Sequence, residues 1–475
     1  MKARYYLMGL SVFFLIAQTT TAQEIDFDLK NYKTTDYERS SLDFYFNFNE
    51  STTKKQNEEE TPDYVYSLAS QNLRSRFNLD YSTINLSRDK LMESGATLSA
   101  SLNNSFSENY RSMYFPKYTL EKSSNVGSGI EFFRNVSNFY SPQFNKFWEY
   151  KVDAKVNMTN FYIVQEKDTN RFESSQLQIP ASISLYIGHG HGRIEFVEDA
   201  VEAIYILDEL QKKGLTIKEI GNDDIKQLAD KITVLKKKRF FDNRFYREEV
   251  MEEFVMFLME NKLIQNATVG LFNTVNDYHY MAGINQRLSG HKFAYGIAPS
   301  LIAMQNYNKL DDSERSNYSL GANAKISYEN HKPVDVKWQK DFYTDITFGL
   351  QNSKSKYNSE NSGNWSSYEV PYSFNSSTNY TIGFYPDTRT YFGSTVYCNL
   401  NFNKLLNFEN KNYAPTYDAG FNFSGYYYLS EHLRLNGSFT INYNYDSDGH
   451  PSSSIENTGY QFAQSFNVSF DYYIF

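Results

Sequence analysis

From residue 40 onward, apolar and polar residues alternate along most of the chain with a period of two. Between Trp148 and Met158 every second position is apolar, and each position between them carries a charged residue or an asparagine. A period of two places successive side chains on opposite faces of a β-strand. The same alternation recurs before residue 188 and after residue 290. The sequence therefore predicts a series of strands with one apolar and one polar face.

The length of the alternating segments separates two classes of all-β protein. Strands of soluble antiparallel sandwiches average about five or six residues. The segments here run for roughly ten to fifteen, the length that a tilted strand needs to cross a bilayer. Their connections alternate between short turns, at 386–389 and 430–432, and long polar segments, at 50–63, 352–368 and 446–459. Because transmembrane barrels have tight turns at one end and long loops at the other, we expect an all-β, antiparallel transmembrane barrel.

Between residues 194 and 289 the spacing of the apolar residues becomes helical. Narrow apolar stripes in segments 196–210, 225–235 and 250–258 predict helices that pack together in a small bundle. Residues 271–288 fit either a helix or a strand, and the choice decides the strand count. Read as a helix, this segment leaves roughly six strands before the insertion and eight after it, an even total of about fourteen, as is usual for single-chain outer-membrane barrels.

An even strand count places both ends of the barrel chain on the periplasmic side of the membrane. The inserted α-helical bundle then follows a strand that has returned to the periplasm. We therefore expect residues 23–39 to be a periplasmic N-terminal segment, residues 40–188 to form barrel strands 1–6, residues 189–290 to form a periplasmic helical insertion, and residues 291–475 to form barrel strands 7–14.

The first residues predict export from the cytoplasm. Lys2 and Arg4 give a positive start, residues 5–17 form an apolar stretch, and residues 20–22 are small. This order is typical of a signal peptide covering residues 1–22, whose apolar stretch is short for a membrane-spanning helix. A signal anchor that stays attached is the alternative. We expect cleavage before Gln23.

Composition narrows the class further. Aromatic residues make up 17% of the 475 residues, yet the mean hydropathy is −0.61. Disordered chains are poor in aromatic residues, and no stretch after the first twenty residues is apolar enough for a spanning helix. A net charge of −9 disfavours a nucleic-acid partner. The single cysteine, Cys398, allows neither an internal disulfide nor a cysteine-based metal site.

With its exported N-terminus, aromatic-rich alternating strands and terminal Phe475, the chain resembles the outer-membrane β-barrel proteins of Gram-negative bacteria, porin-like in the broad sense. The resemblance implies two partners, the outer-membrane lipid and the outer-membrane insertion machinery, and it makes Phe475 the membrane-insertion signal. One feature departs from the family. Counting back by twos from Phe475 gives Tyr473 and Asp471, whereas the apolar face of the last segment carries Tyr472 and Phe470.

The Gly-rich segment 188–193 carries His189 and His191, which could ligate Zn²⁺ or Cu²⁺. No third ligand is fixed by the spacing, so we favour a hinge that turns the chain from the barrel wall into the first helix. No nucleophile lies beside a base in a recognisable motif, which a hydrolase would need. We therefore expect no enzyme and no cofactor.

Charged residues on the polar face of the strands are the candidates for lining a hydrated lumen. They are Arg74, Arg76, Asp80, Glu149, Lys151, Asp153, Lys155, Lys325, Asp345, Asp418 and Arg434. We expect a channel or exit conduit for a polar solute or polymer, gated or partnered through the periplasmic helical domain. The alternative is a structural or assembly barrel with a plugged lumen, whose helical domain binds a periplasmic protein or the cell wall.

Overall fold

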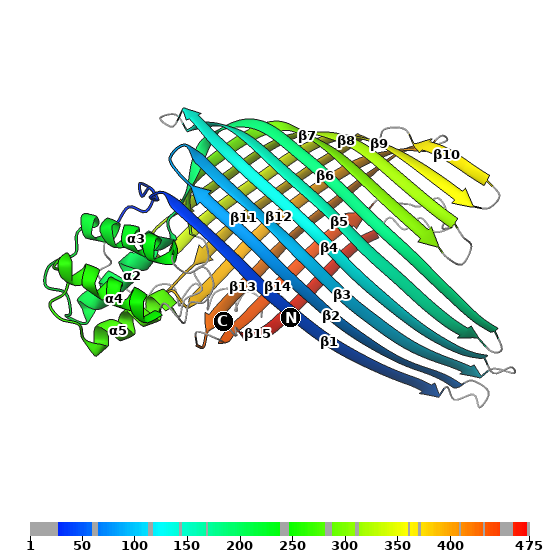
Figure 1. Cartoon of the computed structure of the whole chain (residues 1–475), viewed down its shortest axis with the longest axis horizontal. Helices are drawn as coiled ribbons and strands as arrows, with labels where there is room; N and C mark the ends of the chain where they lie inside the picture. Colours follow the sequence, from blue (N-terminus) through cyan, green and yellow to red (C-terminus); the bar gives the residue numbers. More distant parts are fainter. Residues whose placement is uncertain are drawn as a thin grey trace, which may run out of the picture.

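The computed structural model describes residues 27–58, 65–112, 117–141, 145–167, 170–237, 247–280, 287–308, 313–359, 362–368, 372–407, 410–430, 433–446 and 459–472. Within these residues the chain forms one antiparallel sheet and one helical bundle, and the sheet curls so that its first strands pass in front of its last (Figure 1). The predicted signal peptide 1–22 and the terminal Phe475 lie outside the described residues.

Six strands precede the bundle and, among the described residues, nine follow it. The first six are β1 (Tyr37–Glu58), β2 (Val65–Leu86), β3 (Lys90–Ser112), β4 (Lys117–Ser141), β5 (Lys146–Lys167) and β6 (Asn170–Phe196). The others are β7 (Leu288–Asn308), β8 (Ser313–Pro333), β9 (Trp338–Ser359), β10 (Ser362–Tyr368), β11 (Tyr372–Phe384), β12 (Thr390–Asn407), β13 (Asn410–Tyr428), β14 (Leu433–Asp446) and β15 (Gly459–Tyr472).

Fourteen of these strands are neighbours in chain order, and β10 stands apart from that path. Strand β10 pairs with residues 353–359 of β9, and β11 pairs with residues 338–350 of the same strand. Strands β10 and β11 therefore share one return path along β9. The predicted total of about fourteen strands is confirmed for the strands on this path, six before the bundle and eight after it, and β10 is one strand more than predicted.

Strands β1 and β15 are the two edges of the sheet. Among the described residues no backbone pairing joins them, so the sheet is open at this seam. An unpaired strand edge in hydrocarbon leaves backbone N–H and C=O groups without partners, at a cost of several kcal/mol each. Closure in a bilayer therefore requires these two edges to meet.

The helices form a compact bundle at one end of the sheet, which we call the helical end (Figure 1). They are α2 (Glu198–Lys212), α3 (Asn222–Lys237), α4 (Arg247–Glu260), α5 (Val269–Val275) and a π-helical turn, η2 (Asn276–Tyr280). Their core contains Leu207, Ile225 and Phe254, and Leu29 and Tyr32 of the N-terminal segment pack into it. The helical interpretation of the ambiguous segment holds for residues 271–280, and residues 281–286 lie outside the described part of the chain.

None of the described helices is both long and apolar enough to cross a membrane.

The alternation of the sequence becomes an alternation of faces. On β1, Leu42, Phe44, Phe46 and Phe48 are exposed along one face, and Phe44 is 63% exposed. On β5, Trp148 is 57% exposed on the same face, whereas the next residue, Glu149, points to the other face and is buried. We call the face with the exposed apolar side chains outer and the opposite face inner.

Two segments expected as long loops are instead extensions of the sheet. Residues 50–58 continue β1, and residues 352–359 and 362–368 belong to the β9–β10 hairpin. At about 3.3 Å per residue, a 22-residue strand such as β1 is roughly 70 Å long, well beyond the span of about ten residues that a bilayer needs. These hairpins therefore project from the end opposite the bundle, which we call the far end.

The Gly-rich segment 188–193 is not a hinge, and that prediction is wrong. It lies inside β6, which runs on to Phe196, and Phe196 pairs directly with Leu288 of β7. The glycines serve packing instead: a Cβ on Gly188 would overlap the ring of Tyr186, and one on Gly190 would overlap the ring of Phe147. The helical insertion accordingly spans 197–287, a shorter segment than the expected 189–290.

Candidate functional site

All eleven predicted lumen residues lie on the inner face, but the structure divides them among several strands. Arg74, Arg76 and Asp80 lie on β2, Glu149 to Lys155 on β5, Lys325 on β8, Asp345 on β9, Asp418 on β13 and Arg434 on β14. Two groups of contacts stand out near the helical end. One surrounds Glu149, and the other surrounds Arg434.

Glu149 is the centre of the first group. Its side chain is 1% exposed and lies between two ammonium groups, Lys292 Nζ at 2.5 Å and Lys151 Nζ at 2.7 Å. Ser137 Oγ donates to the same carboxylate at 3.2 Å, and Lys151 Nζ also stands 5.5 Å from the ring centroid of Tyr186. Because a buried charge is stable only when it is paired and hydrogen-bonded, this arrangement holds β4, β5 and β7 together from the inner side.

Lys292 was not among the candidates from the sequence. It is 15% exposed at the side chain, contacts Glu149 and stands 5.1 Å from the ring centroid of Phe147. Its strand β7 continues with Ala294 and Gly296 on the inner face. In the sequence, small inner residues after a lysine are only a weak sign that its side chain reaches a partner on another strand. The proximity of Lys292 to β5 follows from the pairing of β7 with β6 and of β6 with β5.

A polar cavity of about 270 Å³ adjoins this group. Its wall includes Glu93 of β3, Lys151 of β5, Lys325 of β8 and Tyr343 of β9. Strands β3 and β9 are six positions apart in the sheet order, so the wall curves tightly at the helical end. Lys325 Nζ lies 2.9 Å from Asp345, and the Tyr343 hydroxyl donates to that carboxylate at 3.2 Å. The arrangement presents both charge signs to water.

The other predicted lumen residues make weaker contacts. Lys155 pairs with Glu131 in the open, with side chains 49% and 45% exposed. Asp153 accepts a hydrogen bond from Ser184 at 3.4 Å, and Asp418 accepts one from Asn399 at 3.3 Å.

The two histidines of the Gly-rich segment point outward. His189 lies among aromatic side chains, with its ring centroid 5.1 Å from that of Trp148, 5.7 Å from Tyr140 and 5.8 Å from Tyr295. Aromatic belts of this kind are typical of the membrane interface of outer-membrane barrels. Within the described ranges, no group of three or more His, Cys, Asp or Glu side chains is placed to hold a metal ion.

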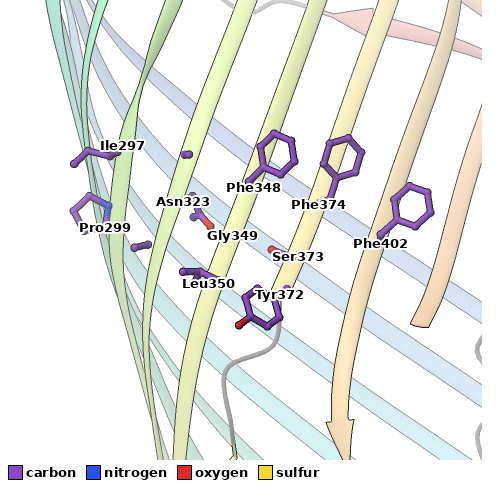
Figure 2. A pocket seen from close by; sticks show the side chains of 12 residues that line it. Ile297, Pro299, Asn323, Phe348, Gly349, Leu350, Tyr372, Ser373, Phe374 and Phe402 are labelled. Atoms are coloured by element: carbon purple, nitrogen blue, oxygen red, sulfur yellow. The ribbon is translucent and has the colours of Figure 1, made fainter. Parts of the chain in front are cut away.

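The outer face also carries an apolar groove of about 800 Å³ (Figure 2). Its lining includes the small residues Ala322 and Ala324 together with Pro299, and Phe348, Phe374 and Phe402 lie in a row in Figure 2. The three phenylalanines are consecutive cross-strand partners on β9, β11 and β12. Since the groove lies on the face with the exposed apolar side chains, it belongs to the lipid-facing wall and not to the lumen.

Two arginines, one just before the bundle and one just after it in the chain, donate hydrogen bonds to turns of the barrel. Arg193 donates to the carbonyl oxygens of Arg88 at 2.7 Å and Ser87 at 3.0 Å in the β2–β3 turn. Arg287 donates to the carbonyl oxygen of Val336 at 2.9 Å, in the β8–β9 turn. The Tyr205 hydroxyl of α2 adds a 2.8 Å hydrogen bond to the carbonyl oxygen of Tyr385, after β11. The bundle is therefore docked against the mouth at several points.

A buried ionic network holds the bundle together. Lys236 of α3 lies 2.5 Å from Asp199 and 2.9 Å from Glu202 of α2, and Glu202 also bonds to His279 of η2. Burial alone would raise the pKa of the Glu202 carboxyl, but Lys236 and His279 outweigh burial and lower that pKa to about 2. For Lys236, burial alone would lower the pKa, whereas Asp199 and Glu202 raise it well above its usual range.

The lowered pKa of Glu202 predicts that the bundle loses stability in acid. A carboxyl group with a depressed folded-state pKa contributes stability above its unfolded value, here 4.5, and that stability disappears as the pH falls toward about 2. The linked free energy is on the order of 3 kcal/mol. We expect the helical circular-dichroism signal to fall over this pH range while the strand signal persists. In Glu202→Gln the pH dependence should flatten, and an unchanged acid transition would contradict this assignment.

These features define the class of protein. Long antiparallel strands in a meander, apolar on the outer face and polar on the inner face, are the fold of a Gram-negative outer-membrane β-barrel. The resemblance inferred from the sequence is thus confirmed at the level of fold. No protein-family model matches the chain, and no curated protein matches it.

Solved structures of outer-membrane proteins match most of the chain, at low sequence identity and low TM-score. The beta domain of the Bordetella autotransporter BrkA is 6% identical, with a TM-score of 0.26 over 91% of this chain and 98% of that chain. The alcaligin outer membrane receptor FauA from Bordetella pertussis is 8% identical, with a TM-score of 0.28 over 89% of this chain and 64% of that chain. Values this low carry no argument about function, which must come from the chain's own geometry.

Proposed function

We propose that the protein is an outer-membrane channel or exit conduit for a polar solute or polymer, with the helical bundle in the periplasm as its gate or docking domain. The observation that carries the proposal is the juxtaposition of a charged, polar inner wall with a bundle docked at the same mouth. A barrel that only anchored itself in the membrane would need neither. The proposal includes no catalytic step and no cofactor.

The orientation is supported by the two ends of the sheet. Turns at the helical end are short, as between β2 and β3 and between β8 and β9, whereas the far end carries long hairpins. In outer-membrane barrels short turns face the periplasm and long extensions face the outside. These two observations support a periplasmic position for the bundle, with a periplasmic protein or a cell-wall polymer as its proposed partner.

Single-channel conductance of the full chain tests the proposal against a variant without the bundle. Because Phe196 and Leu288 are direct cross-strand partners, a short turn can replace residues 197–287 without disturbing β6 or β7. We expect conductance in both proteins, with a larger or less interrupted current in the variant. A closed barrel in both would contradict a conduit. Capture of a stoichiometric periplasmic partner without conductance would instead favour an assembly barrel with a plugged lumen.

A further inference from the structure

A run of tyrosine rings follows the inner wall near the helical end, on the half of the sheet formed by β11 to β14. The ring centroids of Tyr385 and Tyr391 are 4.9 Å apart, those of Tyr391 and Tyr426 are 5.5 Å apart, and those of Tyr426 and Tyr428 are 5.5 Å apart. Their outward neighbour on β13, Tyr427, is 43% exposed on the opposite face. We call Tyr385, Tyr391, Tyr426 and Tyr428 the tyrosine tract.

Glycines shape the first two rings of the tract. A Cβ on Gly383 would lie 2.9 Å from Cε2 of Tyr385 and 3.3 Å from Cε2 of Tyr391. A Cβ on Gly393 would overlap the phenol of Tyr391. Because these glycines have no side chain, the two rings lie down against the wall. A ring that lies along the wall turns a face toward the lumen, whereas an upright ring would present its edge.

Neutral polar side chains stand next to the rings in register. Tyr391, Tyr426, Asn436 and Ser469 are successive cross-strand partners on β12, β13, β14 and β15. The adjacent inner row contains Ser424, Ser438 and Asn467, which are also cross-strand partners. Both rows line a cavity of about 260 Å³. Pockets for small molecules begin at about 300 Å³, so this one suits a single ring of a ligand.

Arg434 completes the cavity. Its guanidinium carbon lies 5.4 Å from the ring centroid of Tyr426 and 5.6 Å from that of Tyr428, and Nη1 donates to the Tyr428 hydroxyl at 3.3 Å. The rings therefore fix the arginine at one end of the row of serine and asparagine side chains.

We propose that this cavity, with Tyr391 and Tyr426 of the tyrosine tract in its wall, binds a carbohydrate, as one ring of a neutral oligosaccharide or polysaccharide. A sugar ring has an apolar C–H face and a rim of hydroxyl groups. The faces of Tyr391 and Tyr426 offer apolar contact, and Asn436, Asn467 and Arg434 offer donors and acceptors for the rim. The polar side chains in the lining disfavour a purely apolar ligand, and the guanidinium of Arg434 in the same lining disfavours a cation.

The inference names the substrate class of the proposed conduit, and it rests on that function only in taking the bound carbohydrate as what the conduit carries. Binding is measured separately on full-length, detergent-solubilised protein. A glycan array of neutral and uronic-acid oligosaccharides identifies the strongest ligand, and isothermal titration measures its Kd. We expect at least one neutral oligosaccharide to bind. The double variant Tyr391→Ala, Tyr426→Ala should bind it at least about tenfold more weakly, since truncating an aromatic anchor costs about this much.

Two variants keep the test specific. Tyr427→Ala removes a tyrosine from the outer face of the same strand and should leave Kd unchanged. Tyr391→Phe with Tyr426→Phe keeps both ring faces and should retain most of the affinity, which also controls for folding. The proposal is overturned if no carbohydrate binds, if only acidic glycans bind and the tyrosine variants bind them equally well, or if the double alanine variant binds as the native protein does.

The conductance and binding measurements can fail independently. Conductance without carbohydrate binding would leave the conduit standing and remove the inference. Carbohydrate binding without conductance would remove the conduit and leave the cavity as a binding site inside a closed barrel.

Discussion

Glu149→Gln is expected to destabilise the barrel by about 3–5 kcal/mol, because it leaves Lys151 and Lys292 facing each other without their shared carboxylate. The carboxylate is 1% exposed at the side chain, so water cannot replace it. Glutamine keeps the shape and the hydrogen bond from Ser137 but loses the charge. Urea unfolding in lipid vesicles, followed by tryptophan fluorescence with Trp148 as the adjacent probe, measures the loss.

Glu131→Gln is the matched control. Glu131 also pairs with a lysine on the inner face, but both side chains of that pair are about half exposed, and exposed pairs contribute about 0–1 kcal/mol. The double variant Glu149→Gln, Lys292→Gln should recover part of the loss, since it removes one uncompensated ammonium together with the carboxylate. Equal effects of Glu149→Gln and Glu131→Gln would show that burial of the cluster does not matter for stability.

The strand pattern was predictable because its physical cause is local. A strand with one lipid-facing and one water-facing side must alternate with a period of two, so Trp148 and Glu149 reveal their faces without any knowledge of their neighbours. For residues 271–288 the helical spacing and an even strand count together favoured a helix, and the structure bears this out for residues 271–280. Chain-order pairing of neighbouring strands needs no long-range information either.

The contacts between strands could not be predicted in the same way. In the segment 188–193, the sequence alone does not show whether the glycines form a hinge or make room for a neighbouring aromatic ring. The structure shows the second, because the rings of Tyr186 and Phe147 pack against Gly188 and Gly190. Only the register of β6 against β5 brings Gly190 opposite Phe147. The tyrosine tract was missed for the same reason, since Tyr391 and Tyr426 become partners only through the pairing of β12 with β13.

The second large effect is expected at Arg287, on the return connection from the bundle to β7. Arg287 is 2% exposed. Its guanidinium donates to Gln339 Oε1 at 2.7 Å and to the carbonyl oxygens of Val336 at 2.9 Å and Asp335 at 3.3 Å. The guanidinium also lies 4.2 Å from the ring centroid of Tyr385. The guanidinium of Arg287 therefore links the connection between the bundle and β7 both to the β8–β9 turn and to the ring of Tyr385.

Arg287→Met should weaken the docking of the bundle by about 3 kcal/mol, because buried acceptors on Gln339 and Val336 lose their donor. The loss should be local. Hydrogen exchange should accelerate in residues 197–237 and in the β8–β9 turn, while the amides of β3 to β5 keep their protection. Arg287→Lys should recover only part of the docking, since an ammonium group cannot reproduce the planar fork of a guanidinium.

Arg389→Met provides the comparison at the same mouth. Arg389 pairs with Asp277 of η2 at 3.0 Å, but the two side chains are 28% and 44% exposed, so its loss should cost less than about 1 kcal/mol. If Arg287→Met left hydrogen exchange of the bundle unchanged, the arginine would not be the docking contact. If it loosened the bundle and also enlarged the single-channel current, whereas Arg389→Met did neither, the bundle would act on the pore through this one buried side chain.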